Sequence, residues 1–316
     1  MPPLVSVVVV NFNGKKFLDD CLSSLARQTF RDFETILVDN GSSDGSAGYV
    51  REHCPFVILI ETGKNLGFAG GTNAGIHAAQ GEFIFTLNND TVADPHMLEE
   101  IVKPMQADLT VGMCGTKMVL PDGRINSTAI CLSRSGAAWD RGMGEPDRGQ
   151  YDTAEETFGP CAGAALYRRT MLHDIGLFDE DFFLFMEDVD LAFRGRLAGW
   201  RCMYMPTARV VHVHGGTAGF RSDISVYYGN RNLAWYIVKN FPPRTLIFSS
   251  PWIIGRNCGV IPYYFLHGKG RVIIRAKMDM IKGLPSMVRK RLTIKRRVPP
   301  SEIERWITTW CQVSKP

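Results

Sequence analysis

Short apolar runs alternate with helix-like patterns along the first hundred residues. Val5 to Val10 is a β-branched run interrupted only by Ser6, which is typical of a strand buried on both faces of a parallel sheet. Similar runs at 33–38, 57–60 and 83–87 predict three more strands. Helical spacing follows the first run, in Phe17, Leu18, Cys21, Leu22 and Leu25, and helices are also expected through Ala79 and from about Asp94. Four strand–loop–helix units predict a parallel sheet with helices on its faces.

A polar loop follows each predicted strand. In a parallel sheet the loops after the strand C-termini lie along one edge, where ligands bind. A single Asn or Asp in such a loop is more often a turn residue than a ligand. Several of them at one edge predict a binding site, made of Asn11, Asn13, Asp39, Asn65, Asn88 and Asp90.

The glycine-rich phosphate-binding fingerprints are missing from the sequence. No G-x-G-x-x-G follows the first strand, and G-x-x-x-x-G-K-[ST] occurs nowhere. The segment 70–75 is rich in glycine, but it lies at a helix start, where glycines permit close packing. A dinucleotide loop or a P-loop is therefore not expected.

An apolar run at 182–186 leads directly into the carboxylates of Glu187, Asp188 and Asp190, where a helical pattern begins. Carboxylates at a helix N-terminus stabilise it by about 0.3–1 kcal/mol each, but three behind an aromatic run exceed what capping needs. Desolvation at the edge of an apolar wall raises a carboxyl pKa, as a general base requires. Taken alone, the stretch leaves capping and catalysis open.

Composition and charge place the chain among folded soluble proteins. Of its 316 residues, 45% are hydrophobic and 22% are charged. The net charge of +4 conceals an asymmetry, because the segment 267–298 holds eleven Lys/Arg and one acid, Asp279. Such a segment suits an anionic surface, either lipid or nucleic acid, and a solvated basic face without a partner is the alternative.

The cysteines and the N-terminus indicate a compartment. The eight cysteines are scattered without a C-x-x-C pair, so we expect a reducing environment and neither a disulfide framework nor a zinc site. The chain enters a strand within three residues and has no basic n-region, so no secretory signal is expected. The expected location is cytoplasmic, on the cytoplasmic face of the membrane.

The character of the sequence changes after Gly219. A helix is expected over 227–240, followed by an apolar stretch, 246–266, that contains Pro251, Arg256 and Pro262. A central Arg costs about 2.5–3.5 kcal/mol on insertion and the prolines interrupt the span, which favours a membrane-surface hairpin or amphipathic helix over a transmembrane helix. The basic residues 269–297 would then lie on anionic headgroups. A helical subdomain packed on the rest of the chain is the alternative.

Five blocks of sequence together resemble the inverting glycosyltransferases of family 2, which have the GT-A fold, and within them the bacterial rhamnosyltransferase-like branch. They occur in family order at 5–14 (VSVVVVNFNG), 38–45 (VDNGSSDG), 65–75 (NLGFAGGTNAG), 87–91 (LNNDT) and 176–190 (GLFDEDFFLFMEDVD). The resemblance implies a Rossmann-like, mostly parallel α/β sheet flanked by helices. It would form a catalytic domain over 1–220, with a nucleotide-binding half (1–106) and an acceptor half (107–220). A helical, apolar-then-basic extension over 221–316 would follow.

The resemblance also assigns roles in binding the donor. Asp39 matches the carboxylate that reads the nucleotide base, and residues 88–90 match a D-x-D motif in which Asn88 replaces the first Asp. In the family the first of these residues meets the ribose and the last binds a divalent metal, so Asp90 is the expected ligand of Mn²⁺ or Mg²⁺. The missing charge at Asn88 should weaken metal binding before the nucleotide arrives. The expected nucleotide-sugar contacts are Asn11, Asn13, Asp39, Asn65, Asn88 and Asn89.

The remaining roles concern catalysis and the acceptor. Asp188 matches the catalytic base, and Glu187 next to it is the second expected catalytic residue. His212 matches a metal-binding His by its spacing to Gly215 and Thr217, while His214, on the same face of a strand, stays open. Trp200 could stack on the acceptor sugar or could close the helix as a core residue.

The expected reaction is metal-assisted, inverting transfer of a sugar from an NDP-sugar, with dTDP-rhamnose as the best guess. The acceptor would be a saccharide or a polyprenyl-linked saccharide. One alternative is a nucleotidyltransferase, which usually has a glycine-rich loop and a Lys after the first strand, where this chain has Asn-Phe-Asn-Gly. Nucleic-acid binding is disfavoured because 269–297 contains no aromatic residue. A non-catalytic sugar-nucleotide-binding protein would be expected to lack Asp39, Asp90 or Asp188. The oligomeric state is left open.

Overall fold

The computed structural model describes residues 2–213 and 222–309. Its N-terminal half contains the predicted parallel strands, in the spatial order β3-β2-β1-β4. These strands are β1 (Val5–Asn11), β2 (Phe33–Asp39), β3 (Val57–Glu61) and β4 (Phe83–Asn88). The helices between and after them are α1 (Lys15–Ala26), α2 (Ser46–His53), α3 (Gly67–Ala78) and α4 (Met97–Ala107).

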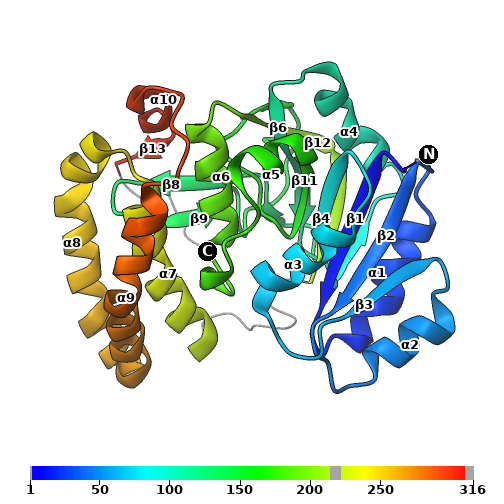
Figure 1. Cartoon of the computed structure of the whole chain (residues 1–316), viewed down its shortest axis with the longest axis horizontal. Coiled ribbons are helices and arrows are strands. Elements are labelled where there is room, and N and C mark those ends of the chain that lie inside the picture. The colour runs from blue at the N-terminus through cyan, green and yellow to red at the C-terminus, as the bar shows by residue number, and fades with distance from the viewer. Residues whose placement is uncertain (1, 214–221, 310–316) are drawn as a thin grey trace.

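The first strand is buried on both faces, as its sequence predicts. Val5, Val7 and Val9 pack into one core with α1 and α4, whereas Val8 packs into a second core on the α3 side. Successive side chains of a strand point to opposite faces, so a run of consecutive valines supplies both cores. Figure 1 shows the helices on either side of the sheet.

The second half of the sheet is mixed rather than parallel. Strand β11 runs antiparallel to both β4 and β6, and β12 runs parallel to β6 and ends next to the short β5. These strands are β5 (Thr91–Ala93), β6 (Val111–Val119), β7 (Ile125–Ser127), β10 (Glu155–Glu156), β11 (Ala164–Arg168) and β12 (Arg201–His212). A smaller sheet contains β8 (Ile130–Ser133), β9 (Ala138–Asp140) and β13 (Ile307–Thr308).

The acidic stretch forms a helix against the sheet, and the C-terminal helices pack beside it (Figure 1). Leu233, Trp235 and Phe241 of the C-terminal part belong to the same core as Phe182 and Phe193. The helices of this region are α5 (Arg169–Ile175), the 3-10 turn η1 (Glu180–Phe182), α6 (Glu187–Leu197), α7 (Asp223–Asn240), α8 (Pro243–Leu266), α9 (Gly270–Arg291) and α10 (Pro300–Glu304).

The prolines of the apolar stretch do not interrupt it, contrary to the sequence-based expectation. Helix α8 is continuous and contains both Pro251 and Pro262. A proline leaves the carbonyl four residues earlier without its helical donor. Here the Ser250 hydroxyl donates to the Ile247 carbonyl at 2.8 Å and replaces the donor that Pro251 lacks. Over the described residues, none of the helices combines the length and apolar character needed to cross a bilayer.

Candidate active site

A chain of hydrogen bonds joins the C-terminal ends of three adjacent strands. Asn11 Nδ2 donates to Asp39 Oδ1 at 3.2 Å, and Asn89 Nδ2 donates to Asn11 Oδ1 at 2.7 Å. The parallel registers bring these positions together, because Asn11 lies opposite Asp39 and Val10 lies opposite Asn88. Asp39 and Asn89 are buried, so the strand ends form a fixed polar edge rather than separate turns.

Two of the predicted contact residues shape the neighbouring loops. Asn13 has a left-handed backbone (φ 52°), and its Oδ1 accepts the Ser43 N–H at 2.8 Å. Asn65 Oδ1 accepts the Gly67 N–H at 2.8 Å, at the start of α3. The sequence reasoning missed Asn40, which donates to the Gly67 carbonyl at 2.9 Å. Its place in the VDNGSSDG block was the signal that could have identified it.

Asp90 and His212 meet at the same edge. Strand β12 ends opposite β5, which places His212 Nε2 3.2 Å from Asp90 Oδ1 and 3.3 Å from Asn88 Nδ2. His212 Nδ1 lies 2.7 Å from Asn126 Oδ1, and both of these side chains are buried. An amide oxygen can only accept, so Nδ1 carries a proton, and Nε2 is the ring nitrogen that faces Asp90.

This pair is chemically suited to a divalent cation. Carboxylate and imidazole are ligands of Mn²⁺, and a metal-bound His commonly donates its other N–H to a polar partner, as His212 does to Asn126. Among the described residues there is no group of three or more His, Cys, Asp or Glu side chains that could hold a metal alone. A cation here would need further ligands. The alternative ligand His214 lies outside the described residues.

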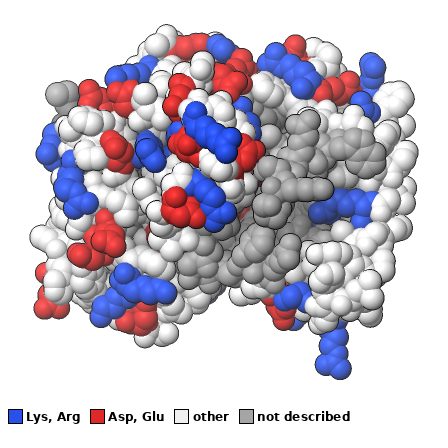
Figure 2. Space-filling model, turned by 180° about the vertical axis from the view of Figure 1, so that it is seen from behind, with Lys and Arg blue, Asp and Glu red and all other residues white. Residues whose placement is uncertain are grey.

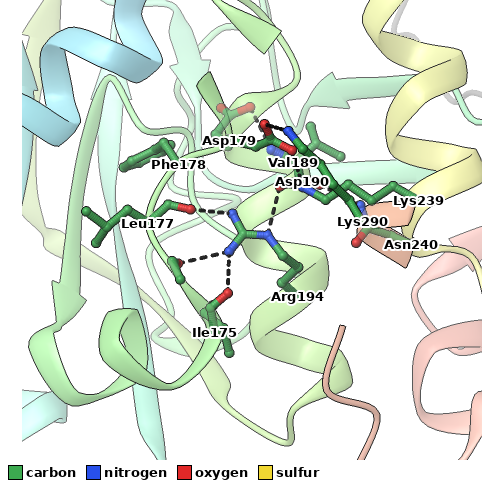
Figure 3. Close-up of polar contacts among 12 residues, drawn as sticks. Ile175, Leu177, Phe178, Asp179, Val189, Asp190, Arg194, Lys239, Asn240 and Lys290 are labelled. Carbon is green, nitrogen blue, oxygen red and sulfur yellow. Dashed lines mark hydrogen bonds and ion pairs between the residues drawn. The ribbon is translucent and has the colours of Figure 1, made fainter. Parts of the chain in front are cut away.

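The carboxylates at the start of α6 have separate roles. Asp190 is fully buried and bonds to Arg194 Nε, Lys239 Nζ and Asn240 Nδ2, each at 2.8 Å (Figure 3). Burial alone would raise the pKa of Asp190, but the charges of Lys239 and Arg194 outweigh burial and hold its pKa at about 2. Asp190 therefore ties α6 to α7 and is not available to a substrate.

Asp188 lies in a different environment. It is half-buried, its Oδ1 accepts the Val189 N–H at 2.8 Å, and burial together with the charge of Asp140 raises its pKa to about 6. Glu187 is buried, and burial, followed by the charge of Asp188, raises its pKa well above the ordinary value. Asp188 has the proton affinity of a general base at neutral pH, whereas Glu187 is held away from solvent. Asp140, on β9, is a second neighbour that the sequence reasoning missed.

A short backbone link connects Asp188 to the edge of the sheet. The Ala162 N–H lies 3.4 Å from Asp188 Oδ2, and the carbonyl of the next residue, Gly163, accepts the Asn88 N–H at 2.9 Å. The Asp188 carboxylate and the Asn88 backbone therefore flank the same two residues, which precede β11. The fold brings the acidic helix, predicted from one part of the sequence, to the polar edge predicted from another.

Trp200 is not brought to this edge. It follows the C-terminal end of α6, whose eleven residues span about 15 Å from the Asp188 end. Its Nε1 donates to Asp174 Oδ2 at 2.9 Å, and its ring packs against the core. This geometry favours the core role over stacking on an acceptor.

The sequence and structure of the chain resemble those of known sugar transferases. Residues 6–176 match the family described as "Glycosyl transferase family 2". An "N-acetylglucosaminyl-diphospho-decaprenol L-rhamnosyltransferase" of Mycobacterium tuberculosis is 30% identical over 90% of this chain and 99% of its own length. Glu187 and Asp188 lie beyond residues 6–176, which match the family model. The similarity to the rhamnosyltransferase extends further, over 90% of the chain.

Two solved structures show the same fold at low identity. The mannosyltransferase PcManGT from Pyrobaculum calidifontis, in complex with GDP-Man and Mn²⁺, has a TM-score of 0.54 and 17% identity, covering 89% of this chain and 88% of its own. TarS 1–349 from S. aureus, in complex with UDP, has a TM-score of 0.53 and 19% identity, covering 80% and 70%. The expected GT-A fold is confirmed.

Proposed function

This chain belongs to glycosyl transferase family 2, and from that premise we propose an inverting, metal-assisted transfer of a sugar from an NDP-sugar, with Asp188 as the base. One observation carries the proposal. Asp188, whose pKa is raised, and the Asp90–His212 pair lie at the same edge of the sheet, and the segment 162–163 connects Asp188 to that edge.

The donor would lie along the ends of β2, β1 and β4. Asp39 would accept a hydrogen bond from the nucleotide base, and Asn88 would meet the ribose, while Asn11, Asn89, Asn13 and Asn65 maintain the shape of the surrounding loops. Asp90 and His212 would hold Mn²⁺ or Mg²⁺ together with diphosphate oxygens, and the bound cation would supply positive charge near the leaving group.

Asp188 would perform the proton transfer. Its ionised carboxylate would take the proton of the acceptor hydroxyl while that oxygen attacks the anomeric carbon from the face opposite the departing nucleoside diphosphate. A single displacement inverts the anomeric configuration and requires no covalent nucleophile. The buried Glu187 would not touch the substrate directly.

The relative indicates the most informative substrates to test. Its name specifies an L-rhamnosyl unit and a polyprenyl-diphosphate-linked N-acetylglucosamine. We extend both to this chain, with dTDP-rhamnose as the donor. A thermal-shift panel of dTDP, UDP and GDP, each with and without Mn²⁺ or Mg²⁺, tests the nucleotide first. A ligand at 100 times its dissociation constant adds about 2.7 kcal/mol of stability.

The base assignment is tested with Asp188→Asn. This variant should keep the metal-dependent shift with nucleotide and lose about 10²–10⁴-fold in transfer rate. Asp181→Asn is a matched control, because Asp181 is an exposed carboxylate of the same acidic stretch that pairs with Lys290. Near-normal turnover by Asp188→Asn would remove the assignment, and no shift with any nucleotide would remove the transferase mechanism.

The exposed surface of α8 and α9 supports a membrane-bound acceptor. Large apolar side chains are exposed on both helices, including Phe248 (59%), Ile254 (61%) and Ile281 (60%). Exposed basic side chains lie among them, such as Arg244, Arg275 and Lys282. Seen from behind, the edge of the molecule that carries α8 is largely uncharged, with separate basic side chains (Figure 2). We propose that this surface lies on anionic lipid at a cytoplasmic membrane face.

Vesicle sedimentation tests this surface. The protein should pellet with phosphatidylglycerol vesicles at low salt and should pellet less with phosphatidylcholine vesicles or at high salt. Ile281→Glu should weaken the pelleting. Leu109→Glu is the control, because Leu109 is 75% exposed in the loop between α4 and β6, outside α8 and α9. Equal pelleting of both variants would exclude α8 and α9 as the contact.

A further inference from the structure

The turn that precedes Asp188 has an uncommon backbone. Phe183, Phe185 and Met186 have φ angles of 64°, 66° and 69°, and among the described residues Asn13 is the only other non-glycine with positive φ. Phe183 (ψ −59°) forms a γ-turn closed by the Leu184 N–H and the Phe182 carbonyl at 2.7 Å. Side chains disfavour this conformation, so it persists only where surrounding contacts impose it.

Asn232 of α7 supplies those contacts. Its Nδ2 lies 2.8, 2.9 and 2.8 Å from the carbonyl oxygens of Phe182, Leu184 and Phe185. The side chain is fully buried, and its two amide hydrogens are shared among three carbonyls. One side-chain amide from another part of the chain therefore contacts three backbone carbonyls of the turn.

Arg231 fixes the orientation of that amide. Its Nε donates to Asn232 Oδ1 at 2.8 Å, so the NH₂ group must face the turn. Its Nη2 donates to the carbonyls of Asp181 and Phe182 at 2.8 and 3.0 Å. The guanidinium group also lies 4.1 Å from the centre of the Trp235 ring, which limits its movement.

The turn and α6 are thus attached to α7 on both sides of Asp188. Asn232 holds the residues before it, whereas Lys239 and Asn240 hold Asp190 after it. The turn also touches the donor side, because the Phe183 carbonyl accepts the Ala69 N–H of α3 at 3.3 Å. With Met186 as the cap residue of α6, the direction of the turn sets where Asp188 points.

We propose that Asn232, oriented by Arg231, is a positioning residue that holds the strained turn and thereby aims the Asp188 carboxylate at the acceptor hydroxyl. The inference rests on the proposed role of Asp188 as the base. A purely structural buried Asn would affect stability alone. A positioning Asn must also affect the rate of the chemical step and the local order of the turn.

The test compares Asn232→Ala with Asn230→Ala. Asn230 is a buried Asn two residues earlier on α7, and its amide donates only within that helix, to the Val226 carbonyl at 2.8 Å. With dTDP-rhamnose and a polyprenyl-diphosphate-linked N-acetylglucosamine, Asn232→Ala should lower kcat by on the order of 10²-fold and leave the donor KM unchanged. Its rate profile should also shift to lower pH, because a loosened turn admits water to Asp188.

A second measurement does not depend on the substrate. Amide hydrogen exchange in the peptide 182–190 should be faster in Asn232→Ala than in Asn230→Ala. Equal exchange and equal kcat in the two variants would overturn the proposal. If Asn232→Ala does not fold, Arg231→Ala, at a half-buried position, takes its place with the same two criteria.

The two proposals fail in different ways. An active Asp188→Asn variant would remove the base assignment whatever Asn232 does. If Asp188→Asn is inactive but Asn232→Ala has the same kcat and amide exchange as Asn230→Ala, only the positioning role of Asn232 is removed.

Discussion

Asn126 Oδ1 accepts the Nδ1–H of His212 at 2.7 Å, and this bond directs His212 Nε2 toward Asp90. The two residues are 86 positions apart in the sequence and come from β7 and β12. Asn126 bonds to one ring nitrogen of His212 and Asp90 lies beside the other, so the imidazole connects the two side chains.

Asn126→Ala should therefore weaken metal binding without removing a ligand. Loss of such a partner typically lowers metal affinity by about 10–100-fold, because the tautomer and the ring orientation are no longer fixed. A Mn²⁺ titration in the presence of the nucleotide, followed by thermal shift, measures the effect. Nucleotide binding in EDTA is the control and should not change. An unchanged Mn²⁺ affinity would mean that His212 does not bind the metal through Nε2.

Asp188→Asn should make the protein more stable at neutral pH. The pKa of Asp188 is raised from 3.8 to about 6, so ionising it in the folded protein is unfavourable. That penalty is absent below about pH 4 and complete above about pH 6, and it is on the order of 1–3 kcal/mol. Denaturant unfolding at pH 8 and pH 4 should show a gain for the variant only at pH 8. A gain of the same size at both values would contradict the raised pKa.

Asp190→Ala should have the opposite effect on stability. It leaves Lys239 and Arg194 with less compensation in a buried site, a change that costs about 3–5 kcal/mol. Asp122→Ala breaks an exposed pair with Arg124 and serves as the control, with an expected change of about 0–1 kcal/mol. Urea unfolding at pH 7 measures both. Because the pKa of Asp190 is lowered to about 2, its contribution is present above about pH 4 and is lost as the pH falls toward 2.

Trp200→Phe should reduce stability and leave the acceptor KM unchanged. The substitution keeps an aromatic ring but removes the hydrogen bond from Nε1 to Asp174, which contributes about 1 kcal/mol. Thermal unfolding and acceptor kinetics are the two measurements. A large rise in acceptor KM with little loss of stability would restore the acceptor role that the sequence left open.

The sequence determined the parallel half of the fold and the set of polar residues at its edge. An apolar run such as Val5 to Val10 can be satisfied only by burial on both faces, and Asn11, Asp39 and Asn88 then fall at strand ends. The resemblance to family 2, which depends on short contiguous blocks, named Asp188 and His212 as candidates.

Only the tertiary structure decided which of these side chains are available for chemistry. Asp188 and Asp190 are two residues apart and alike in sequence, yet the pKa of one is raised to about 6 and that of the other is lowered to about 2. The difference arises because Lys239, 49 residues beyond Asp190, reaches that carboxylate, while the Asp188 carboxylate accepts backbone N–H groups and lies near the charge of Asp140. The sequence likewise could not predict the roles of Asn126 and Asn232, because these roles depend on contacts with residues 86 and about 50 positions away. Pattern fixes which residues a strand or helix carries, whereas charge, desolvation and hydrogen bonding depend on what folding places beside them.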